Sequence, residues 1–490
     1  MSYNNLNDIP ADKFKFVQQD KKLHDRKFDT APVGYFKDAF RRFCRNKSSV
    51  FGGIVILLLI LFAILVPVFS RYKISDRDGY YAYSLPKNEL FVKLDIRFWD
   101  GTKTSTVNQQ KLDRFEATPG TLVEVIEEIE PANGSKRSGY SYKVRFDSYA
   151  AVGYIYKTIS NKEYDAIKAY ESENDVTILY PLIDDGKVNS NAYQNDANAW
   201  YFTDEKGVAV RNADGSFQDI YLYDEEGKPV YYRSVSNDKQ KYVRILYNEY
   251  YKYANGDYAS FLFGADANGY DILVRLASGA RLSLMLSIVV SVINLCIGVI
   301  IGALEGYYGG VFDLIFERLK DFIWEIPTVV VFSLFQMHLA NKVGPVPSLL
   351  FAFVSYGWIT TSNTVRAQFY RFKGQEYVMA ARTLGAKDSR LIFRHILPNG
   401  IGYIITASVL TIPSVIFSEA SLSYMGIVNL QSDSMTSIGT MLNNGQATLS
   451  TYPHCVFFPA MFIALLLICF NLFGNGLRDA FNPALRGADE

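Results

Sequence analysis

Apolar segments alternate with polar segments along the 490-residue chain. Residues 50–70 carry no charge and have the length of about 20 residues that a helix needs to cross a bilayer. Further apolar segments are predicted as spans two to six, at residues 282–304, 319–338, 349–364, 401–418 and 456–473. The pattern predicts an α-helical polytopic membrane protein with six spans and a large polar insertion between the first two.

Basic residues next to the first span predict its orientation. Arg41, Arg42, Arg45 and Lys47 precede it, and positive residues beside spans remain on the cytoplasmic side. Residues 35–71 are interpreted as a basic amphipathic stretch followed by span one. The span is too long and too far from the N-terminus for a cleaved signal peptide. Residues 1–34 are polar without an apolar period and are expected to form a flexible cytoplasmic tail.

Residues 72–260 form the insertion, which we expect to be β-rich and extracytoplasmic because it follows one outward span. Of the 35 tyrosines in the chain, 24 lie within residues 72–258. Alternating segments predict strands, glycine-containing tetrapeptides predict turns, and residues 163–173 predict a short helix. The strands are expected at residues 154–159, 219–223 and 229–235, and the turns at residues 204–207, 212–215 and 224–227. Two interpretations explain the tyrosine excess. The favoured one is the propensity of tyrosine for strands, and the other is a surface that binds a peptide or a binding protein.

Residues 364–400, between spans four and five, are strongly basic, which predicts a cytoplasmic loop. Residues 376–384 are predicted to form a short helix that ends at Gly385, because glycine adopts the left-handed conformation without a Cβ clash. Asp388 is predicted to cap a second short helix, residues 389–397. Pro398, Asn399 and Gly400 are expected to close this unit.

The segment EYVMAARTLGAKDSRLIFRHILPN closely resembles the EAA loop of ABC-transporter permease subunits, and more narrowly that of the oligopeptide/dipeptide importer family. The resemblance implies that the loop docks onto an ATPase subunit. The residues implied in this coupling are Glu376, Ala380, Ala381, Arg382, Gly385, Ala386 and Pro398. Met379 stands where the family usually has the Glu of EAA. Docking through the small residues remains possible with Met379 in place of the glutamate, whereas a salt bridge from this position does not.

Other segments extend the resemblance to residues 36–70 and 261–487. Residues 261–284, FLFGADANGYDILVRLASGARLSL, resemble the entry to the second span of C-type permeases. Two further segments resemble motifs of the same family. EASLSYMG at residues 419–426 resembles the family's EASLSFLG, and GNGLRDAFNPALRG at residues 474–487 resembles its GDGLRDALDPRLRG. Residues 261–487 are therefore interpreted as the permease core, with the six-span type I ABC importer permease fold.

The resemblance implies a permease subunit of an ATP-driven peptide importer in the bacterial cytoplasmic membrane, with both termini in the cytoplasm. The implied partners are a homologous B-type permease, two ATPase subunits, an extracytoplasmic substrate-binding protein, a peptide substrate and membrane lipid, with no nucleic acid. The sequence contains no GxxxxGK[ST], HExxH or GxSxG motif. We therefore expect no enzymatic activity and no cofactor in this chain, with ATP and Mg on the partner ATPases.

Three residues are candidates for the pathway or gate: Glu325, Trp358 and Glu419. Asp313, Glu317, Asp321 and Glu325 recur every fourth residue, and most of them are expected on a cytoplasmic, partner-facing helix surface. Glu325 lies deeper, beside Pro327, where a carboxylate is costly unless it is paired or hydrated. An interfacial residue that snorkels remains an equal interpretation for it.

Two other classes of protein stay open. A membrane-anchored sensor could use the insertion to bind an extracytoplasmic ligand, and an envelope enzyme is disfavoured by the missing catalytic motifs. The four cysteines and four histidines are scattered, with no disulfide framework in the insertion and no metal-ligand spacing. Neither peptide length nor the class of solute follows from the sequence.

Overall fold

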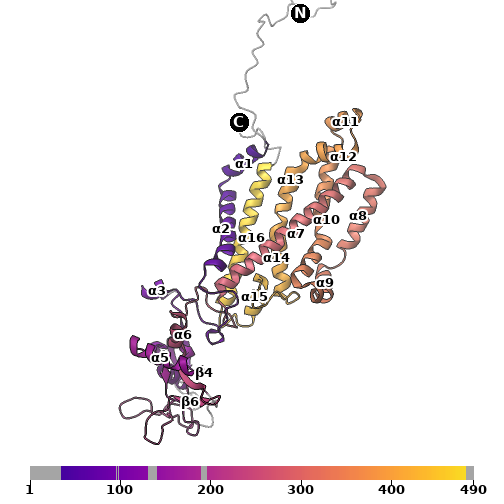
Figure 1. Cartoon of the computed structure of the whole chain (residues 1–490). Helices are drawn as coiled ribbons and strands as arrows, with labels where there is room; N and C mark the ends of the chain where they lie inside the picture. Colours follow the sequence, from indigo (N-terminus) through magenta and orange to yellow (C-terminus); the bar gives the residue numbers. More distant parts are fainter. Residues whose placement is uncertain (1–34, 95, 98, 131–140, 189–195, 482–490) are drawn as a thin grey trace, which may run out of the picture.

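The computed structural model describes residues 35–94, 96–97, 99–130, 141–188 and 196–481. The predicted tail at residues 1–34 and the family-like residues 482–487 lie outside these ranges. Figure 1 shows a bundle of long helices with a smaller region of short helices and strands attached at one end.

The described part of the membrane bundle consists of helices joined by loops, such as residues 425–437. Its helices are α1 (Tyr35–Arg45), α2 (Lys47–Phe69), α7 (Ile272–Tyr308), α8 (Gly310–Trp324), α9 (Thr328–Val343), α10 (Pro345–Phe372), α11 (Glu376–Thr383), α12 (Asp388–Arg390), α13 (Leu397–Val409), α14 (Thr411–Tyr424), α15 (Ile438–Gln446) and α16 (His454–Phe481).

Four helical segments of the described chain are long and apolar enough to cross a membrane: α2, α7, the continuous stretch Asp388–Tyr424, and α16. A fifth span results if α8 and α9, which meet at 75°, are taken together. The predicted third span, residues 319–338, is thus broken near its middle. Pro327 explains the break, because proline lacks an N–H and disfavours the helical region for the residue before it. The more polar α10 lies outside this set, so the six-span count stays a prediction.

Glycines on α7 allow it to pack closely against α10. A Cβ atom at Gly298 would lie 2.6 Å from Thr361 Cβ, and one at Gly306 would lie 2.5 Å from Phe369 Cβ. Gly302 faces the backbone of Ser362 in the same way. The spacing of four residues places these glycines on one face of α7, and that face is a helix-packing surface.

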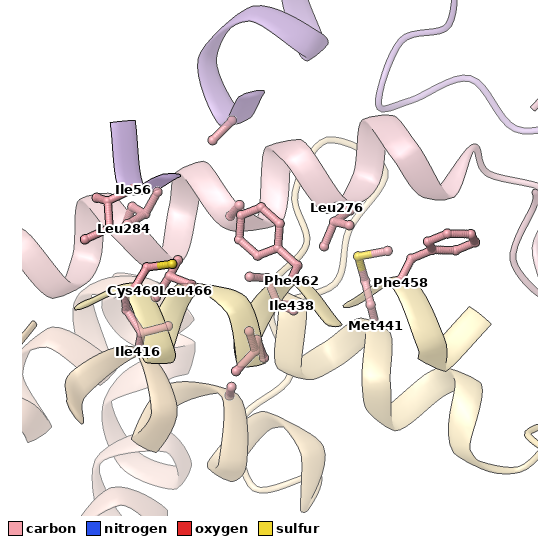
Figure 2. Close-up of a cluster of buried hydrophobic side chains, with 14 of the residues drawn as sticks. Ile56, Leu276, Leu284, Ile416, Ile438, Met441, Phe458, Phe462, Leu466 and Cys469 are labelled. Atoms are coloured by element: carbon pink, nitrogen blue, oxygen red, sulfur yellow. The ribbon is translucent and has the colours of Figure 1, made fainter. Parts of the chain in front are cut away.

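A second packing region joins α2 and α16 to the N-terminal part of α7 (Figure 2). Apolar side chains from five helices meet there. The labelled members are Ile56 of α2, Leu276 and Leu284 of α7, Ile416 of α14, Ile438 and Met441 of α15, and Phe458, Phe462, Leu466 and Cys469 of α16. This core fixes α2 against the rest of the bundle.

The inserted region contains two antiparallel sheets in its described part. One has the order β1-β3-β2, and in the other β4 and β5 flank β7, which also pairs with β6. The strands are β1 (Thr102–Asn108), β2 (Leu122–Ile129), β3 (Ser141–Asp147), β4 (Tyr154–Ser160), β5 (Leu179–Tyr180), β6 (Tyr232–Val235) and β7 (Gln240–Leu246). The helices are α3 (Glu89–Lys93), α4 (Gln109–Glu116), α5 (Asn161–Asn174) and α6 (Tyr247–Asn255).

Local predictions in the insertion have mixed outcomes. The strand at residues 154–159 and the helix at residues 163–173 are confirmed by β4 and α5. Gly207, Gly215 and Gly227 have φ of 77°, 85° and 78°, as predicted for the three turns. The strand at residues 219–223 is wrong, because its backbone forms only isolated bridges, and β6 covers only the end of residues 229–235.

A narrow stem joins the insertion to the bundle. Its incoming and outgoing segments run antiparallel, with Lys87 N donating to Phe261 O at 2.9 Å and Ala265 N donating to Ser84 O at 2.9 Å. The ring of Tyr83 stacks on Tyr452, just before α16, at 4.4 Å. The insertion is therefore held at the end of the bundle opposite to α1 and α11 (Figure 1).

Candidate functional site

Helix α11 and the turn after it match the predicted short helix. Glu376 in the first turn and Arg382 in the last turn both favour the helix dipole. Gly385 has φ of +82°, and its N–H donates to Arg382 O at 3.0 Å. Ala386 N donates to Ala381 O at 3.1 Å. These two bonds with a left-handed glycine form a Schellman motif, so the local sequence determines the end of α11.

The second short helix differs from the prediction. Lys387 is the N-cap, Asp388 is already the first helical residue, and no side chain caps this end. The six residues Leu391–Ile396 form a π-helical turn, and α13 follows without a break. The proposed closure at Pro398 is therefore wrong. The π-helical turn places Pro398 in the first turn of a new α-helical segment, where its missing N–H disrupts little.

The loop that contains α11 is held to the bundle by a buried side chain of α11 and by polar contacts with Tyr307, to which Arg382 of α11 donates at 3.4 Å. Val378 is 0% exposed and lies in a cluster with Val365 and Phe369 of α10 and Ile392 of the π-helical turn. The Tyr307 hydroxyl, at the end of α7, donates to Asp388 Oδ1 at 2.6 Å. These contacts connect the loop rigidly to α7 and α10.

The opposite side of this loop is open. Glu376, Ala380, Arg382, Gly385 and Pro398 are exposed, whereas Ala381 and Ala386 are partly buried. Large apolar side chains are exposed on the same loop, and they are Tyr377, Met379, Leu384 and Phe393. Leu384 is 87% exposed, which leaves its side chain with almost no contact in the isolated chain. Sequence reasoning assigned the small residues to this surface but did not include these apolar ones.

An ion-pair network lies beneath the loop and corrects one expectation. Asp313 belongs to the acidic series expected on a partner-facing surface, yet it is buried, as is the neighbouring Lys320. Lys320 Nζ lies 2.8 Å from Glu305 Oε2, with exposures of 3% and 0%. Arg366 of α10 binds Asp313 through two nitrogens at 2.6 and 2.7 Å. The spacing of Asp313, Glu317 and Lys320 places all three on one helix face, which is the signal that could have revealed the network.

Glu305, Asp313 and Glu317 form an acidic group close enough to hold a metal ion. Lys320 and Arg366 reach these carboxylates directly and supply the compensating positive charge. The group is therefore a structural ion-pair network that ties α7, α8 and α10 together.

The three candidate gate residues occupy different environments. Glu325 is exposed at the bend between α8 and α9. Trp358 is buried in α10, where its Nε1 donates to Ser355 O at 3.2 Å. Glu419 of α14 is 1% exposed and accepts hydrogen bonds from Ser283 at 2.7 Å and Ser423 at 3.0 Å. No hydrogen bond among the described residues joins the three, so their role in a pathway stays a prediction.

Comparisons with known proteins match most of the bundle. Residues 294–487 match the family described as the binding-protein-dependent transport system inner membrane component. Residues 34–86 match the N-terminal TM domain of oligopeptide transport permease C. These two matches leave residues 87–293 uncovered.

Individual relatives agree with these families. The chain is 42% identical to the oligopeptide transport system permease protein OppC of Bacillus subtilis (strain 168) over 224 residues, which are 46% of this chain and 72% of the relative. It is 38% identical to the dipeptide transport system permease protein DppC of the same organism over 229 residues, 46% of this chain and 70% of the relative. A solved inward-facing MetNI methionine ABC transporter covers 42% of this chain and 96% of its own, with 15% identity and a TM-score of 0.34.

Proposed function

The chain belongs to the oligopeptide and dipeptide permease family of ABC transporters, and from this premise we propose that it forms half of the translocation pathway of a peptide importer. In this proposal, α11 and the residues up to the π-helical turn are the coupling element that receives movement from an ATPase subunit. ATP and Mg bind to that partner, and this chain performs no hydrolysis.

The observation that carries the proposal is the two-sided character of α11. One side is anchored through buried Val378, while Ala380 and Leu384 are left exposed beyond the ends of the long helices. An exposed surface of small and apolar residues on a rigid support suits a groove in a partner protein. Met379 adds an apolar contact at the position where the family usually has a glutamate.

The anchoring contacts also supply a route for movement. A displacement of α11 acts on α7 through Tyr307 and Asp388, which are 2.6 Å apart. It acts on α13 through the continuous backbone of the π-helical turn. Rigid-body movement of α11 then tilts helices of the pathway between inward and outward states.

The proposal includes a six-span topology in the bacterial cytoplasmic membrane. The spans are α2, α7, the bent pair α8 and α9, α10, the stretch Asp388–Tyr424, and α16. Basic residues of α1 and of residues 364–400 support a cytoplasmic location for both ends of the chain. The insertion at the opposite end then lies outside the cytoplasm.

A homologous B-type permease, two ATPase subunits and an extracytoplasmic binding protein complete the proposed importer. The alternative, a membrane-anchored sensor, requires no ATPase and places all activity in the insertion. The exposed surface of α11 distinguishes the two, because a sensor has no need of an anchored apolar surface on the cytoplasmic side.

The test replaces Leu384, whose side chain makes almost no contact within this chain, by serine. Leu384→Ser is expected to leave the amount of folded chain in the membrane unchanged. It is expected to lower the amount of ATPase that co-purifies with tagged chain from bacterial membranes, and to lower peptide uptake in parallel. Leu449→Ser is the matched control, because Leu449 is also exposed but follows α15 at the other end of the bundle.

Equal co-purification of the ATPase with both variants and unchanged uptake would overturn the docking role of this surface. Absence of any ATPase from complexes of the unmodified chain would favour the sensor. A loss of ATPase from the Leu449→Ser variant as well would show that the effect is not specific to α11.

A further inference from the structure

An apolar segment of the insertion lies exposed beside the end of the membrane bundle. It comprises the described residues 89–94, 96 and 97, which include α3. Leu90 is 65% exposed and Leu94 is 68% exposed, and Val92 and Ile96 are also exposed. Exposure of these apolar side chains to water is unfavourable. A contiguous exposed apolar segment of this kind marks a surface that contacts lipid or another protein.

The segment is fixed in place by the residues at its two ends. Asn88 N donates to Trp99 O at 2.7 Å, and Asn88 Oδ1 accepts from Leu90 N at 3.0 Å. Ile96 N donates to Phe91 O at 2.9 Å, which closes the loop on itself. The leucines are thus displayed on a closed loop with its own internal hydrogen bonds.

Aromatic stacking sets the level of this loop relative to the membrane. The Trp99 ring stacks on Phe263 and on Phe458 of α16, with centroid distances of 6.4 and 6.0 Å. Phe458 is the fifth residue of α16, so it lies about 6 Å along the axis from the helix start at 1.5 Å per residue. The loop therefore lies at the depth of the first turn or two of a membrane-spanning helix.

Helices near the same end of the bundle also expose apolar side chains. Exposed Val68 and Phe69 end α2, and exposed Phe457 lies next to Phe458 on α16. In Figure 1, α3 is drawn near the level of the end of α2, on the side of the view away from α8 and α9. The exposed Lys93 and Arg97 on the same loop can reach lipid phosphates while their stems remain among the acyl chains.

We propose that residues 89–94, 96 and 97 lie in the membrane–water interface as a lipid anchor, with Leu90 and Leu94 in the boundary between headgroups and acyl chains and Lys93 and Arg97 on the phosphates. Interfacial segments of this kind bury their apolar side about 5–10 Å into that boundary. The anchor fixes the tilt of the insertion over the bundle. It requires only that α2 and α16 cross the bilayer, and does not depend on the substrate or on the ATPase.

Site-directed spin labelling of the full chain in nanodiscs of phosphatidylethanolamine and phosphatidylglycerol tests the anchor. Cysteine is introduced by Leu90→Cys, Leu94→Cys or, as control, Val123→Cys, an exposed apolar residue on β2. The exposed Cys44 and Cys296 are first replaced by serine. Collision rates of each label are measured with molecular oxygen, which is lipid-soluble, and with a water-soluble nickel chelate.

The expected result is a several-fold higher ratio of oxygen to nickel collisions at positions 90 and 94 than at position 123. A ratio at positions 90 and 94 equal to that at position 123 would show that the loop faces water and would overturn the anchor. Low collision rates with both reagents at positions 90 and 94 would show a protein cover, and would overturn it as well.

Discussion

The hydroxyl of Tyr307 donates a 2.6 Å hydrogen bond to Oδ1 of Asp388, and this bond joins the end of α7 to the start of the helical stretch that contains α13 and α14. The two residues are 81 positions apart in the sequence. Val378 of α11 packs in the same apolar cluster as Tyr307. The hydrogen bond therefore orients two elements that apolar packing already holds together. The relationship makes α11 part of the bundle and gives it a defined orientation.

Removing this hydroxyl is expected to loosen the loop without unfolding the bundle. A hydrogen bond to a charged group contributes about 1.5–3 kcal/mol, and this one is partly buried. Tyr307→Phe is therefore expected to increase hydrogen–deuterium exchange in residues 376–390 and to lower peptide uptake. Tyr308→Phe, a change to the exposed neighbouring tyrosine, serves as the control. Identical exchange in the two variants would contradict a clamp at Tyr307.

The left-handed conformation of Gly385 predicts a difference between two substitutions. A non-glycine residue at φ of +82° is strained by about 1–2 kcal/mol, and a β-branched one by more, whereas asparagine tolerates this region. No other atom lies within 4 Å of the position of an added Cβ, so crowding within the chain does not contribute. Gly385→Val is expected to reduce uptake strongly, and Gly385→Asn much less, at equal membrane abundance. Equal uptake by the two variants would show that backbone conformation is not the determinant.

The Lys320–Glu305 pair is expected to contribute to stability only as a pair. Lys320→Met leaves the Glu305 carboxylate, which is 0% exposed, without its cation. Breaking a buried pair in this way costs about 3–5 kcal/mol, so the unfolding temperature of the purified chain is expected to fall clearly. The double variant Lys320→Met with Glu305→Gln is expected to recover much of the loss. A single variant as stable as the unmodified chain would contradict the burial of this network.

Asp271, just before α7, predicts a pH dependence of stability. Burial raises the pKa of its carboxyl from 3.8 to about 7, although its Oδ1 accepts a hydrogen bond from Leu273 N at 2.9 Å. The folded chain then binds this proton more tightly than the unfolded chain. The contribution of Asp271 to the free energy of unfolding is therefore largest at acidic pH and falls as the pH rises from about 4 to 7.

Thermal unfolding of the unmodified chain and of Asp271→Asn between pH 5 and pH 8 checks this dependence. Asparagine keeps the capping oxygen and carries no ionisable proton. The stability of the variant relative to the unmodified chain is expected to increase with pH across this window. A constant difference at all pH values would exclude Asp271 as the titrating group.

Features set by neighbouring residues were predictable from the sequence. The bounds of α11, the left-handed Gly385 and the three glycine turns of the insertion depend on conformational limits of single residues. The packing face of α7 is of the same kind, because the spacing of its glycines and the helical period alone place them on one face. The resemblance of residues 376–399 to the EAA loop added the functional interpretation.

Features set by distant neighbours were not predictable in the same way. Asp388 was expected to cap a helix, but Tyr307 of α7 takes its carboxylate instead. Asp313 belongs to the series expected to face a partner, but it is buried and pairs with Arg366 of α10. The exposed leucines at α3 and its C-cap could be interpreted only from the position of Trp99 against Phe458. Each case depends on which side chain another element brings near, and periodicity within one element does not contain that information.

The stem of the insertion has a consequence for how this chain could change over generations. Lys87 and Phe261 are joined by a 2.9 Å backbone hydrogen bond, so the two ends of the intervening 88–260 segment already meet. A recombination event that added or deleted that segment would leave its junction geometrically closed, as at other sites where domain insertion succeeds. It would remove the contact of Trp99 with Phe458 of α16. Segments of different length could thus be exchanged between α2 and α7 while the order of the bundle helices was inherited unchanged.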